Sequence, residues 1–499
     1  MRVLAVILGV ALLAGEARAA TYFHPELTHR PRLGFDGRDP GHVARLVAHV
    51  SAQEQPWAAT YAAIRDRAER GAIVPYGSSG WDTKPDKWAV LYGQEATNGQ
   101  VAAAKAAVAW LYSQGLDPAW RPLPHLAGEA TPAGWAKAQA AQAARTIEGM
   151  YPSWPCYKGN DVIDRGIVAA DELASHCEAY DLLAALPASL RPSLAAAEKR
   201  IGGLAADLNF YYFTVDVQKN NHSIRVASAL GLAGLTINTF DEYRWWNPAT
   251  AWKRPAAWVA KAEDNLHPSA ASSVLCYQTS TGAYAEGTSY YDYAADLYLP
   301  FFFAYDRFLS GAGVPFLRSD GVTNVARWSL DLRLPDGRRP AVDNATVHAD
   351  FTPGYFLSRA AGGARSAADQ AAFLWDFDRQ GHPGMTGARA ISMLAAFDPA
   401  PSVVQAAAAL ASPWGAQPTR FLDAQGAAVL RSGAGAADAY ALVDAQHGDV
   451  RTRGAGHESV ENGAYTFFAR GDFVTIDPGY PGFTDVAKVN KGEQRSMVL

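Results

Sequence analysis

Cysteine is scarce in this sequence, with three residues among 499, at positions 156, 177 and 276. Their spacing fits neither a zinc site nor a nucleophile motif, so sulfur chemistry is not predicted. The number is odd, which leaves at least one thiol unpaired within the chain. A Cys156–Cys177 disulfide and three buried thiols are the alternatives that remain open.

Positive charge is also in short supply. The chain has 44 Lys and Arg against 49 Asp and Glu, for a formal net charge of −5. Binding to nucleic acid requires a basic footprint, so this balance argues against nucleic acid as a partner. An acidic polymer is a possible partner only where the chain gathers its cations locally.

Long hydrophobic runs are missing except at the start. Arg2 is followed by an apolar stretch at 3–13 and by a small-x-small site that ends at Ala19. This is the pattern of a signal peptide, so we expect residues 1–19 to be cut off after Ala19. No later stretch is long and apolar enough to predict a membrane span. The protein is therefore expected to be exported, to the periplasm or outside the cell.

The rest of the composition is that of a globular protein, 49% hydrophobic and 19% charged, with enough residues for two or three domains. Between residues 20 and 398, apolar side chains recur every three or four residues, the period of a helix. No heptad is sustained, so successive antiparallel helices with short links predict an α/α toroid, an incomplete barrel. The clearest predicted helices are 101–112, 135–150, 168–186, 192–208, 223–237 and 251–266.

The pattern changes near residue 400. Short, alternating or β-branched segments follow, separated by Gly, Asp and Asn, and they predict antiparallel strands. We expect residues 399–499 to form a β-sandwich domain packed against the helices. Because residues 494–499 have strand character, we also expect the natural chain to continue beyond Leu499. The predicted strands are 420–431, 439–445, 464–469 and 473–476.

A first polar cluster, residues 219–225, directly precedes a long apolar run. Asn is a good N-cap, and in a helix that begins here His222 and Arg225 share one face. An amide, an imidazole and a guanidinium at a helix start can bind an anionic group. The plainer alternative is an Asn cap, a hydrogen-bonded His and a solvated Arg.

A second cluster, residues 282–293, holds four tyrosines in ten residues and opens a predicted helix toward residue 303. We expect Pro300 to kink or end the first part of this helix. Tyr291, Tyr298 and Phe302 fall on roughly one face, so an aromatic core stripe is one interpretation. The carboxylates and hydroxyls at the helix start favour a functional site as the other.

A third cluster, residues 454–463, places His457 in a Gly-rich loop between predicted strands. A His in such a loop can reach a cleft between the two domains. The simpler interpretation is a loop His hydrogen-bonded to the backbone. A turn, Asp477-Pro478-Gly479-Tyr480, follows the next strand pair.

Together the three clusters resemble the heparinase II/III-like and oligo-alginate lyase superfamily of polysaccharide lyases, over nearly all of the mature chain. The resemblance pairs Asn221-His222 with the Asn-His that opens a toroid helix in that family. The family's Gly-x-x-x-Glu-x-x-x-x-Tyr pattern corresponds to Gly282, Glu286 and Tyr291, and its sandwich His segment corresponds to residues 457–461. The domain order, helical toroid then β-sandwich, is also the family's.

One feature of that family is not matched. Many members hold a structural zinc with the second His of the sandwich segment, the turn Asp and a later His-Asn. This chain has Ser459, Asp477 and Arg495-Ser496 at those places. A lone carboxylate does not hold zinc, so we expect neither this metal site nor a cofactor.

The resemblance implies β-elimination on a uronic-acid polymer, an acidic polysaccharide or oligosaccharide. In such a reaction Asn221 neutralises the carboxylate next to C5, and His222 and Tyr291 serve as base and acid. His457 orients the sugar or shares in neutralising its charge. A one-residue shift in the match exchanges Tyr291 for a neighbouring tyrosine. Candidate substrate-binding residues are Arg225, Glu286, Tyr290 and Tyr293.

Two other functions remain open. An α/α-toroid glycoside hydrolase would use paired carboxylates such as Glu286 and Asp292 with an activated water. A catalytically decayed, exported glycan-binding protein would retain the fold without turnover. The lyase accounts for Asn221-His222 and His457, which the hydrolase leaves unexplained.

Overall fold

The structure of the protein is a computed structural model. Helices dominate up to residue 409 and a single antiparallel sheet follows. The residues that the structure describes are 29–74, 88–116, 131–150, 162–210, 212, 219–240, 255–308, 314–343, 345–350, 352–359, 362–381, 389–415, 418–445 and 464–475.

The helices predicted from apolar periodicity are present, and α4 begins earlier than predicted. Several helices begin with a side chain that caps the first turn, as Thr131 does for α5 by accepting from the Gly134 N–H. The helix bounds are α2 Pro40–Ser51, α3 Trp57–Arg70, α4 Trp88–Ser113, α5 Pro132–Glu148, α6 Val162–Ala184, α7 Ala195–Phe210, α8 Asn221–Thr236, α9 Pro255–Leu266, α10 Val274–Thr279, α11 Thr288–Tyr305, η4 Phe316–Arg318, α12 Asp320–Asp331, α13 Thr352–Leu357, α14 Ala367–Arg379, α15 Ala390–Ala396 and α16 Pro401–Ala409.

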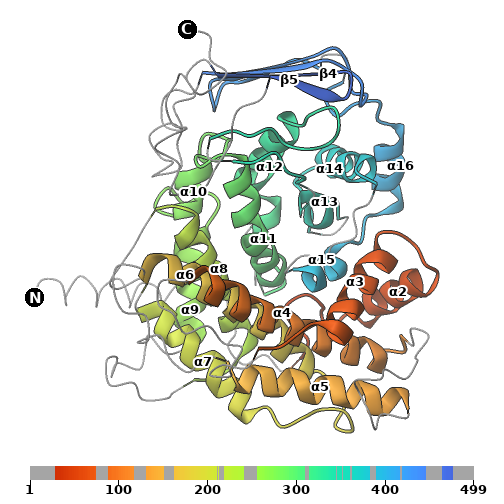
Figure 1. Cartoon of the computed structure of the whole chain (residues 1–499), viewed down its shortest axis with the longest axis vertical. Coiled ribbons are helices and arrows are strands. Elements are labelled where there is room, and N and C mark those ends of the chain that lie inside the picture. Colours follow the sequence, from red (N-terminus) through yellow and green to blue (C-terminus); the bar gives the residue numbers. More distant parts are fainter. Residues whose placement is uncertain are drawn as a thin grey trace, which may run out of the picture.

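The helices form two layers arranged as a ring. In the inner layer α4 packs on α6, α6 on α8, α8 on α11, α11 on α13, α13 on α15, and α15 returns to α4. Outer helices lie against these, with α5 on α4 and α6, α7 on α6 and α8, and α9 on α8 (Figure 1). This closed circuit is the α/α toroid that the sequence predicts.

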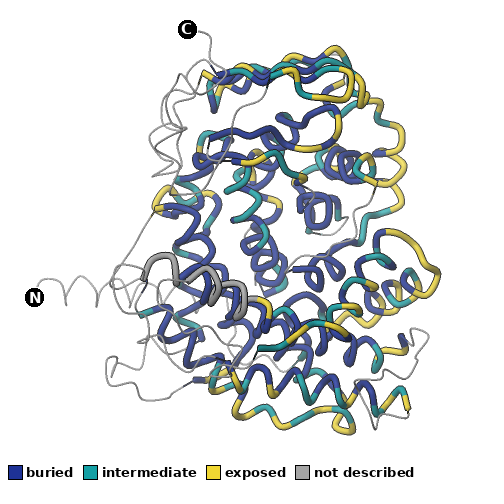
Figure 2. Tube along the Cα trace, viewed as in Figure 1, coloured by how far each residue is buried: buried dark blue, intermediate teal, exposed yellow. Residues whose placement is uncertain are grey.

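Helix α8 is buried along its whole length. Small residues allow this, because a Cβ at Gly231 would overlap the Phe301 ring of α11, and one at Gly234 would come within 2.6 Å of the Pro255 carbonyl oxygen. Neighbouring helices therefore approach the backbone of α8 closely. Figure 2 shows the inner helices as buried and places the exposed residues on the outer surface.

A five-stranded antiparallel sheet in the order β1-β2-β3-β4-β5 lies across the end of the helical domain, next to α12 (Figure 1). The Tyr440 hydroxyl donates to the Leu332 carbonyl at 2.9 Å, and Trp328 Nε1 donates to Gln425 Oε1 at 2.6 Å. These bonds fix the sheet on the end of α12. The strand bounds are β1 Arg420–Leu422, β2 Ala427–Arg431, β3 Tyr440–Asp444, β4 Ala464–Ala469 and β5 Asp472–Thr475.

The opposite face of this sheet is apolar and exposed. Phe421 is 74% exposed and Val474 is 61% exposed, and Leu430, Val443 and Phe467 are also open to solvent. Side chains alternate between the two faces of a strand, so these residues share the face turned away from the helices. The part of the chain that the structure describes contains one sheet of the predicted sandwich.

Two local expectations are corrected. The segment predicted as one strand, 420–431, is a hairpin of β1 and β2, because Gly426 adopts a φ of +80° and closes a turn between them. Helix α11 runs through Pro300 to Tyr305 without ending there. Close packing on the neighbouring helices outweighs the single backbone hydrogen bond that Pro300 lacks.

Cys177 and Cys276 are free thiols, and Cys177 lies buried in α6. Cys177 therefore does not form the Cys156–Cys177 disulfide. Cys156 itself lies outside the described residues. Burial raises the pKa of the Cys177 thiol, which makes it unreactive. Among the described helices, none has both the length and the apolar character needed to cross a membrane.

Candidate functional site

The first polar cluster forms the start of α8. The Asn220 side chain accepts a hydrogen bond from the His222 backbone N–H at 3.0 Å, so Asn220 is the N-cap that the sequence predicts. Asn221 is fully buried and His222 is 7% exposed. Lys219, just before the cap, is exposed. The cluster therefore holds an exposed cation, a helix cap and a nearly buried imidazole.

Glu286 joins the second cluster to the first. Its two carboxylate oxygens accept from Asn221, one from the backbone N–H at 2.6 Å and the other from Nδ2 at 2.9 Å. This grip fixes the Asn221 amide in one orientation. It also occupies Glu286, which is fully buried, so Glu286 holds Asn221 in place and is not available to contact a substrate directly.

The backbone that delivers Glu286 requires glycine at the next position. Gly287 precedes α11 with a φ of +83°, and a Cβ there would collide with the Val342 carbonyl oxygen. The same helix start is fixed by Thr288, whose hydroxyl donates to the Pro340 carbonyl at 3.0 Å. A tight loop thus presents Glu286 to α8.

The charge state of Glu286 is set by opposing effects. Burial raises the pKa of Glu286 to about 8, whereas the hydrogen bonds from Asn221 lower it. The Asn221 Oδ1 atom is buried and has no hydrogen-bond partner among the described residues. A buried, oriented amide with an unused acceptor is uncommon in a core that only needs to pack.

Arg225 lies one turn further along α8 and is not solvated. Its guanidinium pairs with Asp171 of α6 and with Asp296 of α11, the latter at 2.5 Å, and it donates to the Tyr293 carbonyl. It also stacks on the Tyr293 ring, 3.6 Å from the ring centroid. Arg225 is 1% exposed, so it ties three inner helices together instead of reaching toward solvent.

Tyr291 points into the core. It is 1% exposed and packs 6.0 Å from the Tyr284 ring and 6.1 Å from the Trp328 ring, measured between centroids. Tyr298 and Phe302 are fully buried on the same face, so the aromatic core stripe is confirmed. Burial raises the pKa of Tyr291 well above 10, and its neighbours Tyr298 and Asp350 raise it further.

Tyr290 and Tyr293 lie on a different face of α11. Both are half-buried, and Tyr293 meets the guanidinium of Arg225 from α8. Residues three apart on a helix share a face, so these two phenols and the start of α8 lie on the same side of α11. Among the second-cluster tyrosines, Tyr293 is the one whose ring is stacked on a guanidinium.

The structure adds a histidine that the sequence motifs do not identify. His348 lies in the segment that wraps around the start of α11, where its Nδ1 lies 2.7 Å from the Thr346 carbonyl and 3.4 Å from the Ser289 hydroxyl. Nδ1 therefore carries the proton, and burial lowers the pKa of this imidazole. The only sequence signal was a His in a polar stretch, far from all three clusters.

The carboxylate pair of the hydrolase alternative is divided between two environments. Glu286 is bonded to Asn221, whereas Asp292 accepts from the Thr352 hydroxyl at 3.2 Å. Burial raises the pKa of Asp292, and the nearby Asp350 raises it further. The two carboxylates therefore have different partners, and Glu286 is the one committed to Asn221.

The third cluster lies outside the described residues. This applies to His457, to Ser459 and to the turn at Asp477, as well as to Arg495. Within the described ranges no group of three or more His, Cys, Asp or Glu side chains is placed to hold a metal ion. The first two clusters are therefore brought together, and the position of the third stays a prediction.

No protein-family model matches the chain, and no curated protein matches it. Solved structures that match include a heparinase III, at 13% identity and a TM-score of 0.45, covering 92% of this chain and 66% of that chain. A mutant heparan sulfate lyase from Pedobacter heparinus matches at 15% identity and a TM-score of 0.46, covering 92% and 66%.

A further heparinase III structure matches at 12% identity and a TM-score of 0.44, covering 88% of this chain and 65% of that chain. The chain thus spans just under two thirds of the length of these matched structures. They are structures of the class that the three sequence clusters resemble.

Proposed function

We propose that this protein is a polysaccharide lyase that cleaves a uronic-acid-containing polysaccharide by β-elimination. The observation that carries the proposal is the Asn221–Glu286 pair, which brings the Asn-His motif of α8 and the Tyr-rich start of α11 into one place. A hydrolase built on Glu286 and Asp292 would gain nothing from this pairing, because it occupies one of its two carboxylates.

The reaction removes the C5 proton of a uronate and expels the oxygen at C4. The electron pair of the C–H bond becomes the C4–C5 double bond, the C4–O bond breaks, and the leaving oxygen takes up a proton. The C5 proton is barely acidic while the adjacent carboxylate is fully charged, so a fixed donor must stabilise the enolate-like transition state. We assign this role to Asn221, because Glu286 holds only one hydrogen of its Nδ2 group. Since Asn221 is fully buried, this role requires the start of α8 to open when the polymer binds.

The phenol of the reaction is assigned to Tyr290 or Tyr293. Tyr291, the position matched by the sequence motif, has its ring packed in the aromatic core against Tyr284 and Trp328. Its raised pKa also disfavours the phenolate form that a base requires. Tyr293 is half-buried with its ring on the guanidinium of Arg225, and Tyr290 lies one turn earlier on the same face.

The remaining roles fall to histidines and to one cation. His222 follows Asn221 directly and is the second proton-transfer group, and His457 of the strand domain completes the site by orienting the sugar. Because Arg225 is neutralised by two carboxylates, the exposed Lys219 beside the Asn220 cap is the cation that meets the acidic polymer.

The domain organisation belongs to the same proposal. Residues 1–19 act as a signal peptide, residues 20–398 form the toroid and residues 399–499 belong to the sandwich. The charged n-region and apolar h-region at the start support export. A substrate too large to cross a membrane requires an enzyme that is itself exported.

The test is an absorbance assay on alginate, heparan sulfate, chondroitin and hyaluronan with the full-length protein. A lyase generates the ultraviolet absorbance of the unsaturated uronate on at least one of these chains. Reducing ends formed without that absorbance would identify a hydrolase, and an unchanged polymer that still binds would identify a glycan-binding protein.

The tyrosine assignment is tested with three matched variants. We expect Tyr290→Phe or Tyr293→Phe to lower kcat by about 10²–10⁴-fold, the range of a proton-transfer group, and Tyr291→Phe to stay within about tenfold of wild type. All three lose one hydroxyl, so melting temperature controls for packing. Loss of turnover in Tyr291→Phe alone would return the role to the buried tyrosine.

A further inference from the structure

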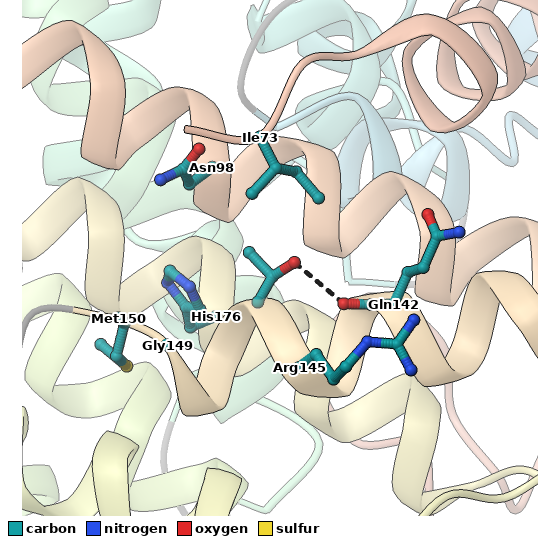
Figure 3. Close-up of a pocket in the computed structure, with 8 residues that line it drawn as sticks. Ile73, Asn98, Gln142, Arg145, Gly149, Met150 and His176 are labelled. Carbon is teal, nitrogen blue, oxygen red and sulfur yellow. Dashed lines mark hydrogen bonds between the residues drawn. The ribbon is translucent and has the colours of Figure 1, made fainter. Parts of the chain in front are cut away.

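A cavity lies between the inner helices α4 and α6 and the outer helix α5. It has a volume of about 300 Å³, the size of small-molecule sites, and Figure 3 shows the side chains around it. None of the residues assigned to the lyase site lines it. The lining residues are Ile73, Asn98, Gln142, Arg145, Thr146, Gly149, Met150 and His176.

His176 supplies a buried acceptor to this cavity. The side chain is fully buried, and its Nδ1 lies 2.8 Å from the Glu172 carbonyl of its own helix, so Nδ1 carries the proton. The Nε2 atom then presents a lone pair and has no hydrogen-bond partner among the described residues. Burial lowers the pKa of His176 to about 4, so the ring stays neutral at physiological pH.

Hydrogen bonds hold the part of the cavity wall formed by Asn98 and Thr146 in place. The Asn98 side chain bonds both backbone groups of Val74, donating to the carbonyl at 2.8 Å and accepting from the N–H at 2.9 Å. This fixes Ile73 against α4 at the edge of the cavity. The Thr146 hydroxyl donates to the Gln142 carbonyl at 2.9 Å, which leaves the lone pairs of its oxygen for a second donor.

The two ends of the cavity differ in character. His176, Thr146 and Met150 are buried at its inner end, whereas Arg145 and Gly149 are exposed at its opening near the end of α5. The cavity therefore has a guanidinium at its exposed edge, a neutral imidazole acceptor on its buried wall, and apolar Ile73 and Met150 also in its lining. Hydroxyl donors suit the inner end and an anion suits the opening.

We propose that this cavity binds a single-ring sugar acid, with its carboxylate on Arg145, a hydroxyl donating to His176 Nε2 and its C–H face on Ile73 and Met150. The site does not depend on the proposed lyase reaction, because it shares no residue with it. A neutral sugar lacks the anion for Arg145, and a simple carboxylate lacks the hydroxyl for His176.

The experiment is calorimetric titration of the full-length protein with D-glucuronate, D-glucose and acetate as probes, up to about 10 mM. We expect saturable binding of D-glucuronate and at least tenfold weaker binding of the other two. Arg145→Gln weakens D-glucuronate binding at least tenfold, while Arg191→Gln, an exposed arginine outside the cavity, leaves it unchanged.

His176→Leu tests the inner end, and its melting temperature reports whether the fold is kept. If that variant is unstable, the ring resonances of His176 in the wild-type protein replace it, since D-glucuronate must shift them and acetate must not. Acetate binding as tightly as D-glucuronate, or affinity unchanged in Arg145→Gln, overturns the proposal. Absence of any heat with D-glucuronate also overturns it.

Discussion

At the residue scale, Glu286 fixes the orientation of Asn221 at the start of α8 through two hydrogen bonds. It was predicted as a substrate-binding residue, and its type and approximate place in the site were accessible from the sequence. Its partner was not, because Asn221 lies 65 positions away and only the fold brings the two together. A carboxylate that precedes a Tyr-rich helix start does not indicate in the sequence which residue it will bond to.

The raised pKa of Glu286 predicts a pH-dependent stability. In the unfolded chain its pKa is 4.5, and in the folded protein it is about 8. Between these values the unfolded chain releases the proton and the folded protein retains it, so stability falls as pH rises from about 4.5 to 8, by a few kcal/mol at most. Glu286→Gln removes this dependence.

The measurement is melting temperature at several pH values for both proteins. Glu286→Gln loses one hydrogen bond to Asn221 at every pH, so the difference in slope is the informative quantity. As pH rises from about 4.5 to 8, the melting temperature of wild type should fall relative to that of Glu286→Gln. Parallel pH profiles would show that Glu286 is ionised throughout.

Gly287 is required at its position by the local backbone geometry. Gly287→Ala requires a conformation that costs an L-residue about 1–2 kcal/mol, and it also forces the Val342 carbonyl to move. We expect a larger loss of stability than this strain alone, and a loss of lyase turnover because Glu286 shifts away from Asn221.

Gly381→Ala is the matched control. Gly381 has a φ of +77° and its Cβ would meet nothing within 4 Å, so only the backbone strain applies. Thermal unfolding and the absorbance assay compare the two variants. Equal destabilisation by both, with turnover kept in Gly287→Ala, would contradict the role given to this loop.

At the scale of elements, α6, α8 and α11 are joined through Arg225. The sequence predicted these helices from the spacing of their apolar residues, and that prediction was confirmed. It did not predict which way each helix is rotated, because a one-residue change in helix start turns every side chain by about 100°. This is why Tyr291 faces the core while its neighbours at 290 and 293 do not.

Removal of the Arg225 guanidinium should be costly. Arg225→Met leaves Asp296 without its paired cation, while Asp171 keeps Arg389 at 3.5 Å. Breaking a fully buried pair costs about 3–5 kcal/mol, and the partial exposure of Asp296 places this variant toward the lower end of that range. We expect a clear drop in melting temperature. Hydrogen-exchange measurements should also show faster exchange of the backbone amides in α6 and α11.

Arg45→Met is the comparison, because Arg45 pairs with Asp398 at 2.9 Å but its side chain is 53% exposed. Exposed pairs contribute about 0–1 kcal/mol, so this variant should melt close to wild type. If both variants lost the same stability, Arg225 would not be the link between the three helices.

At the scale of the whole molecule, the outer face of the sheet stands out. Phe421, Leu430 and Val474 are exposed on one side of five paired strands, and exposed apolar patches of this kind promote association or cover by another surface. The alternation in the strands was readable from the sequence. Which of the two faces meets the helices was decided by contacts such as Tyr440 with Leu332.

This face predicts self-association of the 499-residue chain. The double variant Phe421→Ser with Val474→Thr should bind less of an apolar dye such as anilinonaphthalene sulfonate and remain monomeric at higher concentration. Val314→Thr is the control, a 67% exposed valine outside the sheet. Light scattering and dye fluorescence give the comparison, and equal behaviour of the two variants would rule out the sheet face as the cause.

The sequence by itself determined the order of helices and strands, the helical period and an Asn cap at the start of α8. These are properties of neighbours along the chain, so local spacing and propensity are sufficient to predict them. The tertiary structure alone decided that Glu286 holds Asn221, that Arg225 is neutralised and that Tyr291 is buried. Those outcomes depend on helix rotation and on contacts across more than fifty residues, which no local pattern encodes.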